Sequence, residues 1–292
     1  KLEALGEPKK DAVRFNEACD SLIYGDHPWS VDIDSSAVEG VDMTLVGEIY
    51  RREFNPSLGM TVFIAGNLDE SKVKEYVCKY IASIPDGDKS VKKSNVKERV
   101  PAFKGVSEFS MTGKKEINPY TLVSRIFSSK VKPTTESIAA VDFVDYILSQ
   151  RLLNQIREKR GGTYTIRFSS TVSVREKGRS ESEITFKTRP DLYKVLVGDL
   201  DDVISGFNAE GPTEKELEEA RTWLIKNNLE SKAKRSESMS HRNSQVMNLI
   251  RNGIDPNADW EAAYRKVSAE DVRKASGKLT GGNSLTVIYT EE

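Results

Sequence analysis

The stretch QIREKRGGTYTI, residues 155–166, joins a helical pattern to a strand-like pattern through two adjacent glycines. Glycine directly after a helical pattern is a stop signal, and the alternation of apolar and polar residues that begins at Tyr164 is typical of a strand. The sequence therefore predicts a helix end, a sharp bend and a strand. Arg157, Arg160 and Tyr164 all lie close to that bend.

The residues alone leave two interpretations of this bend open. Arg157 follows Ile156 near the end of the helix, where the helix dipole favours a cation. Tyr164 shares a strand face with Ile166 and Phe168, which is the pattern of a core tyrosine whose hydroxyl finds a partner. The other interpretation is that the arginine and the tyrosine project into a site.

The residues around the bend predict an alternation of strands and helices. Strands are expected at about 105–112, 120–128, 163–168, around 184–186 and at 285–289. Pro133 and Glu136 mark the start of a helix that runs to about Lys159. Its buried stripe is predicted to be Ile138, Val141, Val144, Leu148, Leu152 and Ile156. Further helices are expected at 191–207, from a capping box of Thr213 and Glu216 past Trp223, and at 237–252 and 268–279.

The first part of the chain ends with a similar order of elements. Helices are expected at 8–24, 41–54 and 69–84, and the run Met60–Ala65 is expected to form a central strand. The second of these helices should turn Met43, Val46, Ile49 and Tyr50 inward. Helix, turn and strand thus close both halves, which indicates two copies of one fold with the first truncated at its start.

Length and composition limit the class of protein. A chain of 292 residues can hold two domains, and a formal net charge of −1 gives no field that would favour nucleic acid. The polar, lysine-rich stretch 85–105 is interpreted as a solvated connector, and no apolar run is long enough to span a membrane. Cys19 and Cys78 lie far apart and form no C-x-x-C pattern, so neither a disulfide framework nor a thiolate zinc site is expected.

Catalytic motifs are missing from the sequence. The two histidines, His27 and His241, begin none of the motifs H-x-x-E-H, H-E-x-x-H or H-x-x-H. A catalytic zinc needs about three protein ligands and an open position, so we expect no metal ligands in this chain. The sequence also holds no P-loop, G-x-G-x-x-G or G-x-S-x-G motif.

Four segments, in order, carry a family resemblance: YGDHPW (24–29), FIAGNLDESKVKEYVCKYIASIP (63–85), QRLLNQIREKRGGTYTI (150–166) and GPTEKELEEARTWL (211–224). They resemble the inverzincin zinc metallopeptidases of the pitrilysin and insulysin type, and most of all the C-terminal half of a long bacterial member. The resemblance implies four related α/β (α+β) domains, each a mixed, largely antiparallel β-sheet packed by helices. It also implies a zinc-bearing N-terminal half and a C-terminal half that lacks the zinc motif.

The resemblance implies roles for two residues of the bend. Arg157 and Tyr164 match an arginine and a tyrosine, seven positions apart, that the C-terminal half supplies to the active site. Arg157 would then orient the substrate backbone, and Tyr164 would donate a hydrogen bond to the scissile carbonyl as it becomes an oxyanion. Arg160, four positions from Tyr164, does not have this spacing.

The expected organisation follows from the same resemblance. Residues 1–88 would be the C-terminal part of one inactive peptidase-like domain, 89–104 a linker and 105–292 a complete inactive domain. The chain, which opens with KLEALGEPKK and no Met, would be a piece of a longer protein, inactive by itself and paired with a zinc-bearing half and a peptide substrate. The resemblance favours the bacterial periplasm or cell envelope. A non-enzymatic scaffold that keeps the fold is the alternative, and a peptide-binding module that uses a strand edge is a third possibility.

Overall fold

The computed structural model describes residues 10–25, 27, 30, 35–92, 100–114, 117–174 and 176–292. Contacts between residues divide the chain into two units. The described part of the first unit lies within 27–92, and that of the second lies within 10–25 and 100–292. The expected opening helix residues 8 and 9, the turn residues 26, 28 and 29, and part of the linker, 93–99, lie outside the described residues.

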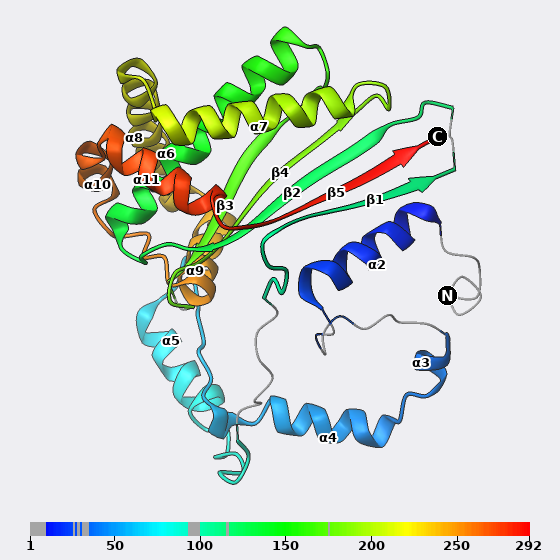
Figure 1. Cartoon of the computed structure of the whole chain (residues 1–292). Helices are drawn as coiled ribbons and strands as arrows, with labels where there is room; N and C mark the ends of the chain where they lie inside the picture. The colour runs from blue at the N-terminus through cyan, green and yellow to red at the C-terminus, as the bar shows by residue number, and fades with distance from the viewer. Residues whose placement is uncertain are drawn as a thin grey trace. The chain divides into compact units, whose positions relative to one another are not determined.

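The second unit is built on one five-stranded sheet (Figure 1). Its strands are β1 (Val106–Gly113), β2 (Thr121–Lys130), β3 (Arg167–Ser173), β4 (Arg179–Thr188) and β5 (Asn283–Glu291), in the order β1-β5-β2-β4-β3. Only β1 and β5 pair in parallel; β5 pairs antiparallel with β2, β2 with β4, and β4 with β3. The predicted fold class, a mixed and largely antiparallel sheet packed by helices, is confirmed.

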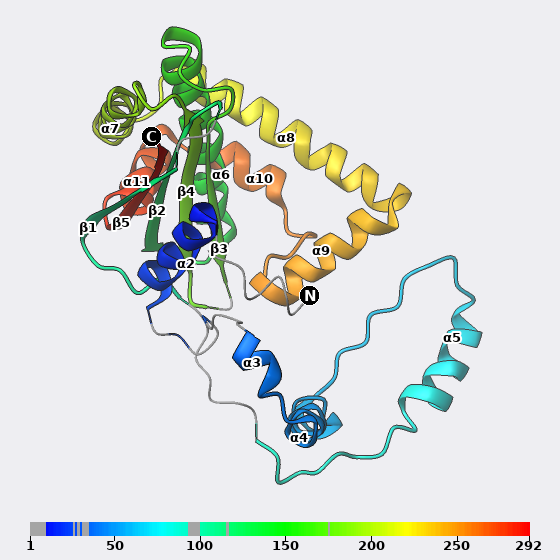
Figure 2. The ribbon, with the colours of Figure 1, turned by 90° about the vertical axis from the view of Figure 1, so that its right-hand side faces the viewer.

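Helices cover both faces of this sheet. The helices of the second unit are α2 (Asp11–Tyr24), α6 (Thr135–Leu152), α7 (Tyr193–Glu210), α8 (Glu214–Glu237), α9 (Met239–Asn252), α10 (Trp260–Lys266) and α11 (Ala269–Thr280). The helices α6, α7 and α11 pack against one another and share one core with β2, β3 and β4. In Figure 2, α2 lies in front of the sheet, where Phe15 and Cys19 pack on alternate residues of β5.

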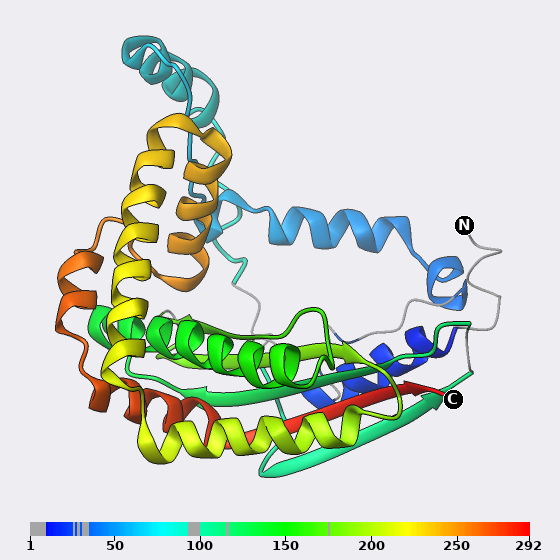
Figure 3. The same ribbon diagram turned by 90° about the horizontal axis from the view of Figure 1, so that it is seen from above.

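The core of the second unit follows the predicted pattern of α6. All six residues of the predicted stripe are buried, from Ile138 at 9% exposed to Ile156 at 0%. The helix continues beyond Leu152 as a π-helical turn, η3 (Leu153–Lys159), which ends where the sequence predicts the helix to end. The predicted capping box at Thr213 and Glu216 is present and begins α8. In Figure 3, α8 and α9 lie side by side as a helical hairpin beyond the sheet.

The first unit is helical in its described part. It contains α3 (Ser35–Glu39), α4 (Met43–Glu53), a short 3₁₀ turn η1 (Pro56–Leu58), α5 (Glu70–Tyr76) and a π-helical turn η2 (Val77–Ile81). Asn55 stabilises the turn after α4, because its side chain accepts a hydrogen bond from Ser57 N and donates one to Asp88 O. The helices predicted at 41–54 and 69–84 are present in shortened form.

Two predictions for the first unit are wrong. The run Met60–Ala65 forms no strand, and Met43, Val46, Ile49 and Tyr50, predicted to face inward, are all exposed. A strand needs a hydrogen-bonding neighbour, and the described residues of this unit contain no strand with which Met60–Ala65 could pair. Without a sheet, the apolar face of α4 has no surface on which to pack. The local pattern specifies the apolar residues but cannot supply the sheet that buries them.

Candidate functional site

Arg157 and Tyr164 lie together on the surface of the second unit. The Cζ atom of Arg157 is 5.5 Å from the centroid of the Tyr164 ring, which is within the range of a cation–π contact. Tyr164 is 83% exposed, so the interpretation of this residue as a core tyrosine is wrong. Strand β3 begins only at Arg167, and Ile166 and Phe168 enter the core without the tyrosine.

The bend between the two residues depends on both glycines. Gly161 adopts φ +60°, a left-handed conformation that is costly for other residues, and its N–H donates to Arg157 O over 2.8 Å. Gly162 N donates to Ile156 O over 3.1 Å. A Cβ atom on Gly162 would lie 2.6 Å from Leu196 Cδ1, so the chain here presses directly against α7. The bend is a packed element of the second unit.

Arg160 anchors the same bend. Its guanidinium donates two hydrogen bonds to the Asp199 carboxylate, Nε to Oδ2 at 2.8 Å and Nη2 to Oδ1 at 3.0 Å. The Asp199 side chain is only 8% exposed, and Gln155 Nε2 donates to it as well, over 3.3 Å. The hydrogen bonds from Arg160 lower the pKa of Asp199. Arg160 is therefore turned toward α7, whereas Arg157 is left beside Tyr164.

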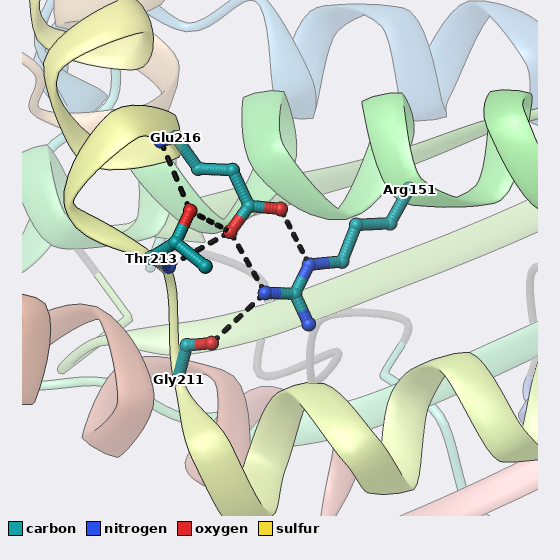
Figure 4. A network of polar contacts seen from close by, with 4 residues as sticks. All are labelled: Arg151, Gly211, Thr213 and Glu216. Atoms are coloured by element: carbon teal, nitrogen blue, oxygen red, sulfur yellow. Dashed lines mark hydrogen bonds and ion pairs between the residues drawn. The ribbon is translucent and has the colours of Figure 1, made fainter.

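A second ion pair fixes the helix that leads to Arg157 (Figure 4). Arg151 Nε and Nη2 donate to the two oxygens of Glu216, at 2.7 and 2.8 Å, and Nη2 also donates to Gly211 O at 3.0 Å. The Glu216 carboxylate also accepts from Thr213 N, which makes it part of the cap of α8. Burial raises the pKa of Glu216, but the hydrogen bonds from Arg151 and Thr213 outweigh it and hold the pKa at about 2. The end of α6 is thereby tied to the start of α8.

The described side chains of the second unit do not fit a catalytic zinc. Among the described residues, no three His, Cys, Asp or Glu side chains come together to hold a metal ion. The ring of His241 is held by Ser231 Oγ at 2.9 Å and by the Gln245 amide at 3.2 Å, and His27 belongs to the other unit. In the described part of the chain, no helix is both long and apolar enough to cross a bilayer.

Sequence reasoning missed a pair of shielded acids on α6. Asp142 Oδ2 accepts from the Tyr264 hydroxyl at 2.8 Å, and Asp145 accepts from both N and Oγ of Ser170. Removal from water raises the pKa of Asp142 to about 7 and that of Asp145 to about 6. The available signal is the pair of aspartates within the apolar run VDFVDYIL, 141–148, since carboxylates on a core-facing helix need partners.

A model of the peptidase M16 inactive domain matches residues 46–224. This stretch is more than half of the chain, and the chain belongs to the peptidase M16 inactive-domain family. The chain is also 25% identical, over 235 residues, to the probable zinc protease PqqL of Escherichia coli strain K12. That match covers 77% of this chain but 24% of PqqL, so the chain spans about a quarter of its curated relative.

Solved structures show the same fold. The periplasmic protease PqqL from Escherichia coli matches with a TM-score of 0.76 at 19% identity, over 96% of this chain and 30% of PqqL. The first half of PqqL, solved separately, matches with a TM-score of 0.76 at 12% identity, over 100% of this chain and 65% of that half. An M16 inactive domain from Pseudomonas fluorescens matches with a TM-score of 0.69 at 18% identity, over 96% of this chain and 65% of that domain.

Proposed function

We propose that this chain is the catalytically incomplete C-terminal half of a zinc metalloendopeptidase, which completes the substrate chamber and supplies Arg157 and Tyr164 to the active site of a zinc-bearing half. One observation carries the proposal: the arginine and the tyrosine meet, exposed, on a bend that Arg160 and Asp199 anchor from beneath. A purely structural tyrosine would be expected to bury its ring. Membership of the M16 inactive-domain family supports the same assignment.

The two side chains would act on the substrate, not on the metal. The Tyr164 hydroxyl would donate a hydrogen bond to the scissile carbonyl oxygen as negative charge develops there. The Arg157 guanidinium, which carries several N–H donors in a fixed plane, would bind a backbone carbonyl of the substrate and hold the peptide in register. The cation–π contact between the two side chains would limit their rotation before the substrate arrives.

The proposal includes the partner and the compartment. The zinc ion would be bound by the other half, either on the same polypeptide or on a separate subunit, and would supply the activated water for peptide hydrolysis. Residues 1–88 would form the end of one inactive domain, from which residues 10–25 pack on the sheet of the second unit. Residues 89–104 would form the linker and 105–292 a second inactive domain. The compartment would be the bacterial periplasm or cell envelope, a proposal that the description of the similar PqqL as a periplasmic protease supports.

Reconstitution tests the proposal. The isolated chain should bind no stoichiometric zinc by elemental analysis and should cleave no peptide. Added to the zinc-bearing half, it should raise peptide turnover, and Arg157→Ala or Tyr164→Phe should remove most of that gain. Lys159→Ala, an exposed change on the same turn, serves as the matched control. Stoichiometric zinc with chelator-sensitive cleavage by the isolated chain would contradict the proposal. Unchanged turnover in both variants would instead assign the chain to a scaffold role.

A further inference from the structure

The hydroxyl of Thr188 is bonded to the second glycine of the bend. Thr188 Oγ1 donates a hydrogen bond to Gly162 O over 2.5 Å. Thr188 is 7% exposed and Gly162 is buried, so water competes little for this contact. Among the residues that the structure describes, no other group donates to this carbonyl. Because buried carbonyls are almost always paired, the bend depends on the Thr188 hydroxyl.

Thr188 belongs to a strand that its neighbours hold on both sides. It is the last residue of β4, which pairs with β2 on one side and with β3 on the other. Strand β3 begins only at Arg167, opposite Thr185, so β4 extends past the start of β3. The bend is bonded to this extension of β4 through the Thr188 hydroxyl. A side chain of the sheet therefore fixes a backbone atom of the bend.

The two sides of the bend are held by different contacts. The helical side, which carries Arg157, is anchored by the ion pair of Arg160. On the other side, Gly162 lies two positions before Tyr164 and is bonded to Thr188. The Tyr164 side chain is 83% exposed, so no buried pocket fixes its ring. The position of this ring depends on the backbone that leads to it.

We propose that Thr188 is a positioning residue for Tyr164. Its hydroxyl fixes the Gly162 carbonyl and thereby sets where the exposed tyrosine lies relative to Arg157. Without the hydroxyl, the carbonyl would be buried with no donor, and the chain would shift to reach water or another donor. A shift of about 1 Å near the reacting atoms can lower turnover by about a hundredfold. This effect on turnover rests on the proposed function of Tyr164, whereas the effect on its position does not.

Nuclear magnetic resonance of the full chain tests the positioning without any reaction. The Tyr164 ring should shift the side-chain resonances of Arg157, and Tyr164→Leu gives their positions without the ring. Thr188→Val keeps the shape of the side chain, removes the donor and should move these resonances toward the Tyr164→Leu positions. Thr188→Ser keeps the hydroxyl and should retain the parent resonances.

Thr121→Val is the matched control. Thr121 is buried and lies opposite Thr188 in the sheet, but its hydroxyl donates to Thr290 over 3.1 Å and not to the bend. The variant removes one buried hydroxyl from the same part of the sheet and should leave the Arg157 resonances in place. Thermal melting checks that each variant is folded, and Thr188→Ala repeats the test should the valine variant not fold.

Turnover by the zinc-bearing half combined with the chain tests the catalytic consequence. Thr188→Val should lower kcat about tenfold or more and change KM less than about twofold, because the Arg157 side of the bend stays anchored. Thr188→Ser should restore most of kcat, and Thr121→Val should leave both constants unchanged. In a Tyr164→Phe background, Thr188→Val should lower kcat little further, because the hydroxyl that it positions is already absent.

The outcomes separate this proposal from the proposed function. Parent-like Arg157 resonances in the folded Thr188→Val chain, or equal changes in Thr188→Val and Thr121→Val, would overturn the positioning role. A kcat that falls in Tyr164→Phe but not in Thr188→Val would also overturn it and leave the proposed function standing. Resonances that move in Thr188→Val, with turnover unchanged in Tyr164→Phe, would support the positioning role and contradict the proposed function.

Discussion

The Arg157 guanidinium lies 5.5 Å from the centroid of the Tyr164 ring, although a helix end and a glycine bend separate the two residues in sequence. The contact exists because η3 ends beside Arg157 and the chain reverses at Gly161, which places Tyr164 over the last helical turn. Arg160, between them, is turned the other way and bonded to Asp199. This short segment therefore contains two arginines with different surroundings: Arg160 anchors the bend, and Arg157 is exposed beside Tyr164.

Loss of the Arg160–Asp199 ion pair should destabilise the second unit. Arg160→Met leaves the Asp199 carboxylate, which is 8% exposed, without its main partner, and should lower the free energy of unfolding. Lys159→Met removes a neighbouring exposed cation and should change it by less than about 0.5 kcal/mol. Urea unfolding followed by circular dichroism measures both. Equal, small effects in the two variants would show that the Arg160–Asp199 pair does not fix the bend.

Substitution by alanine should destabilise the chain for different reasons at Gly161 and at Gly162. Gly162→Ala places a Cβ atom 2.6 Å from Leu196 Cδ1 and should cost about 1–3 kcal/mol through overpacking. Gly161→Ala meets nothing within 4 Å but must keep φ near +60°, at a cost of about 1 kcal/mol. Only Gly162→Ala should also be rescued in part by Leu196→Ala, since the two side chains compete for one space. Absence of rescue in the double variant would contradict the packing account.

The sequence predicted the second unit well because most of its elements are encoded locally. The stripe on α6, the capping box at Thr213 and the alternation in β4 are all found, and each depends on residues a few positions apart. The short α10 was missed, because its buried residues Trp260 and Tyr264 lie in a segment too brief to show periodicity. The run Met60–Ala65 was misassigned because a strand depends on a pairing partner that local sequence does not reveal.

The candidate site, like the fold, could be predicted from the sequence only in part. Spacing and context predict Arg157 and Tyr164 as site residues only through the family resemblance, whereas alternation alone predicts Tyr164 in the core, where it is not. Alternation fails at Tyr164 because β3 begins only after the bend, at Arg167. The hydrogen bond from Thr188 to Gly162 could not be predicted, because it forms only when the bend packs against the end of β4.

The Arg151–Glu216 pair should make the free energy of unfolding depend on pH in the acidic range. The pKa of Glu216 is about 2 in the folded chain and 4.5 as the ordinary value, so its contribution is present above about pH 4.5 and is lost as the pH falls toward 2. Glu216→Gln should therefore be less stable than the parent at pH 7, by about 1.5 kcal/mol or more. This difference should shrink between pH 4.5 and pH 2. A difference that stays constant over that range would contradict the lowered pKa.

The pH dependence of stability that Asp142 contributes should have the opposite sign to that of Glu216. Its pKa is raised from 3.8 to about 7, so the folded chain disfavours the ionised carboxylate. The parent should lose stability relative to Asp142→Asn as the pH rises from about 4 to about 7, by roughly 2–4 kcal/mol. Urea unfolding at several pH values measures this. Tyr264→Phe removes the hydroxyl that donates to Asp142 and should raise the pKa further. Parallel pH profiles for the parent and Asp142→Asn would contradict this assignment.

The most direct test of the account is the turnover of a peptide by the zinc-bearing half combined with the Tyr164→Phe chain. Because the hydroxyl is proposed to bind the oxyanion, kcat should fall by about 10²–10³, while KM changes little. Tyr76→Phe, an exposed hydroxyl removal in the first unit, should leave both constants unchanged. A kcat for Tyr164→Phe equal to that of the unmodified pair, with the chain still folded and bound, would contradict the central claim.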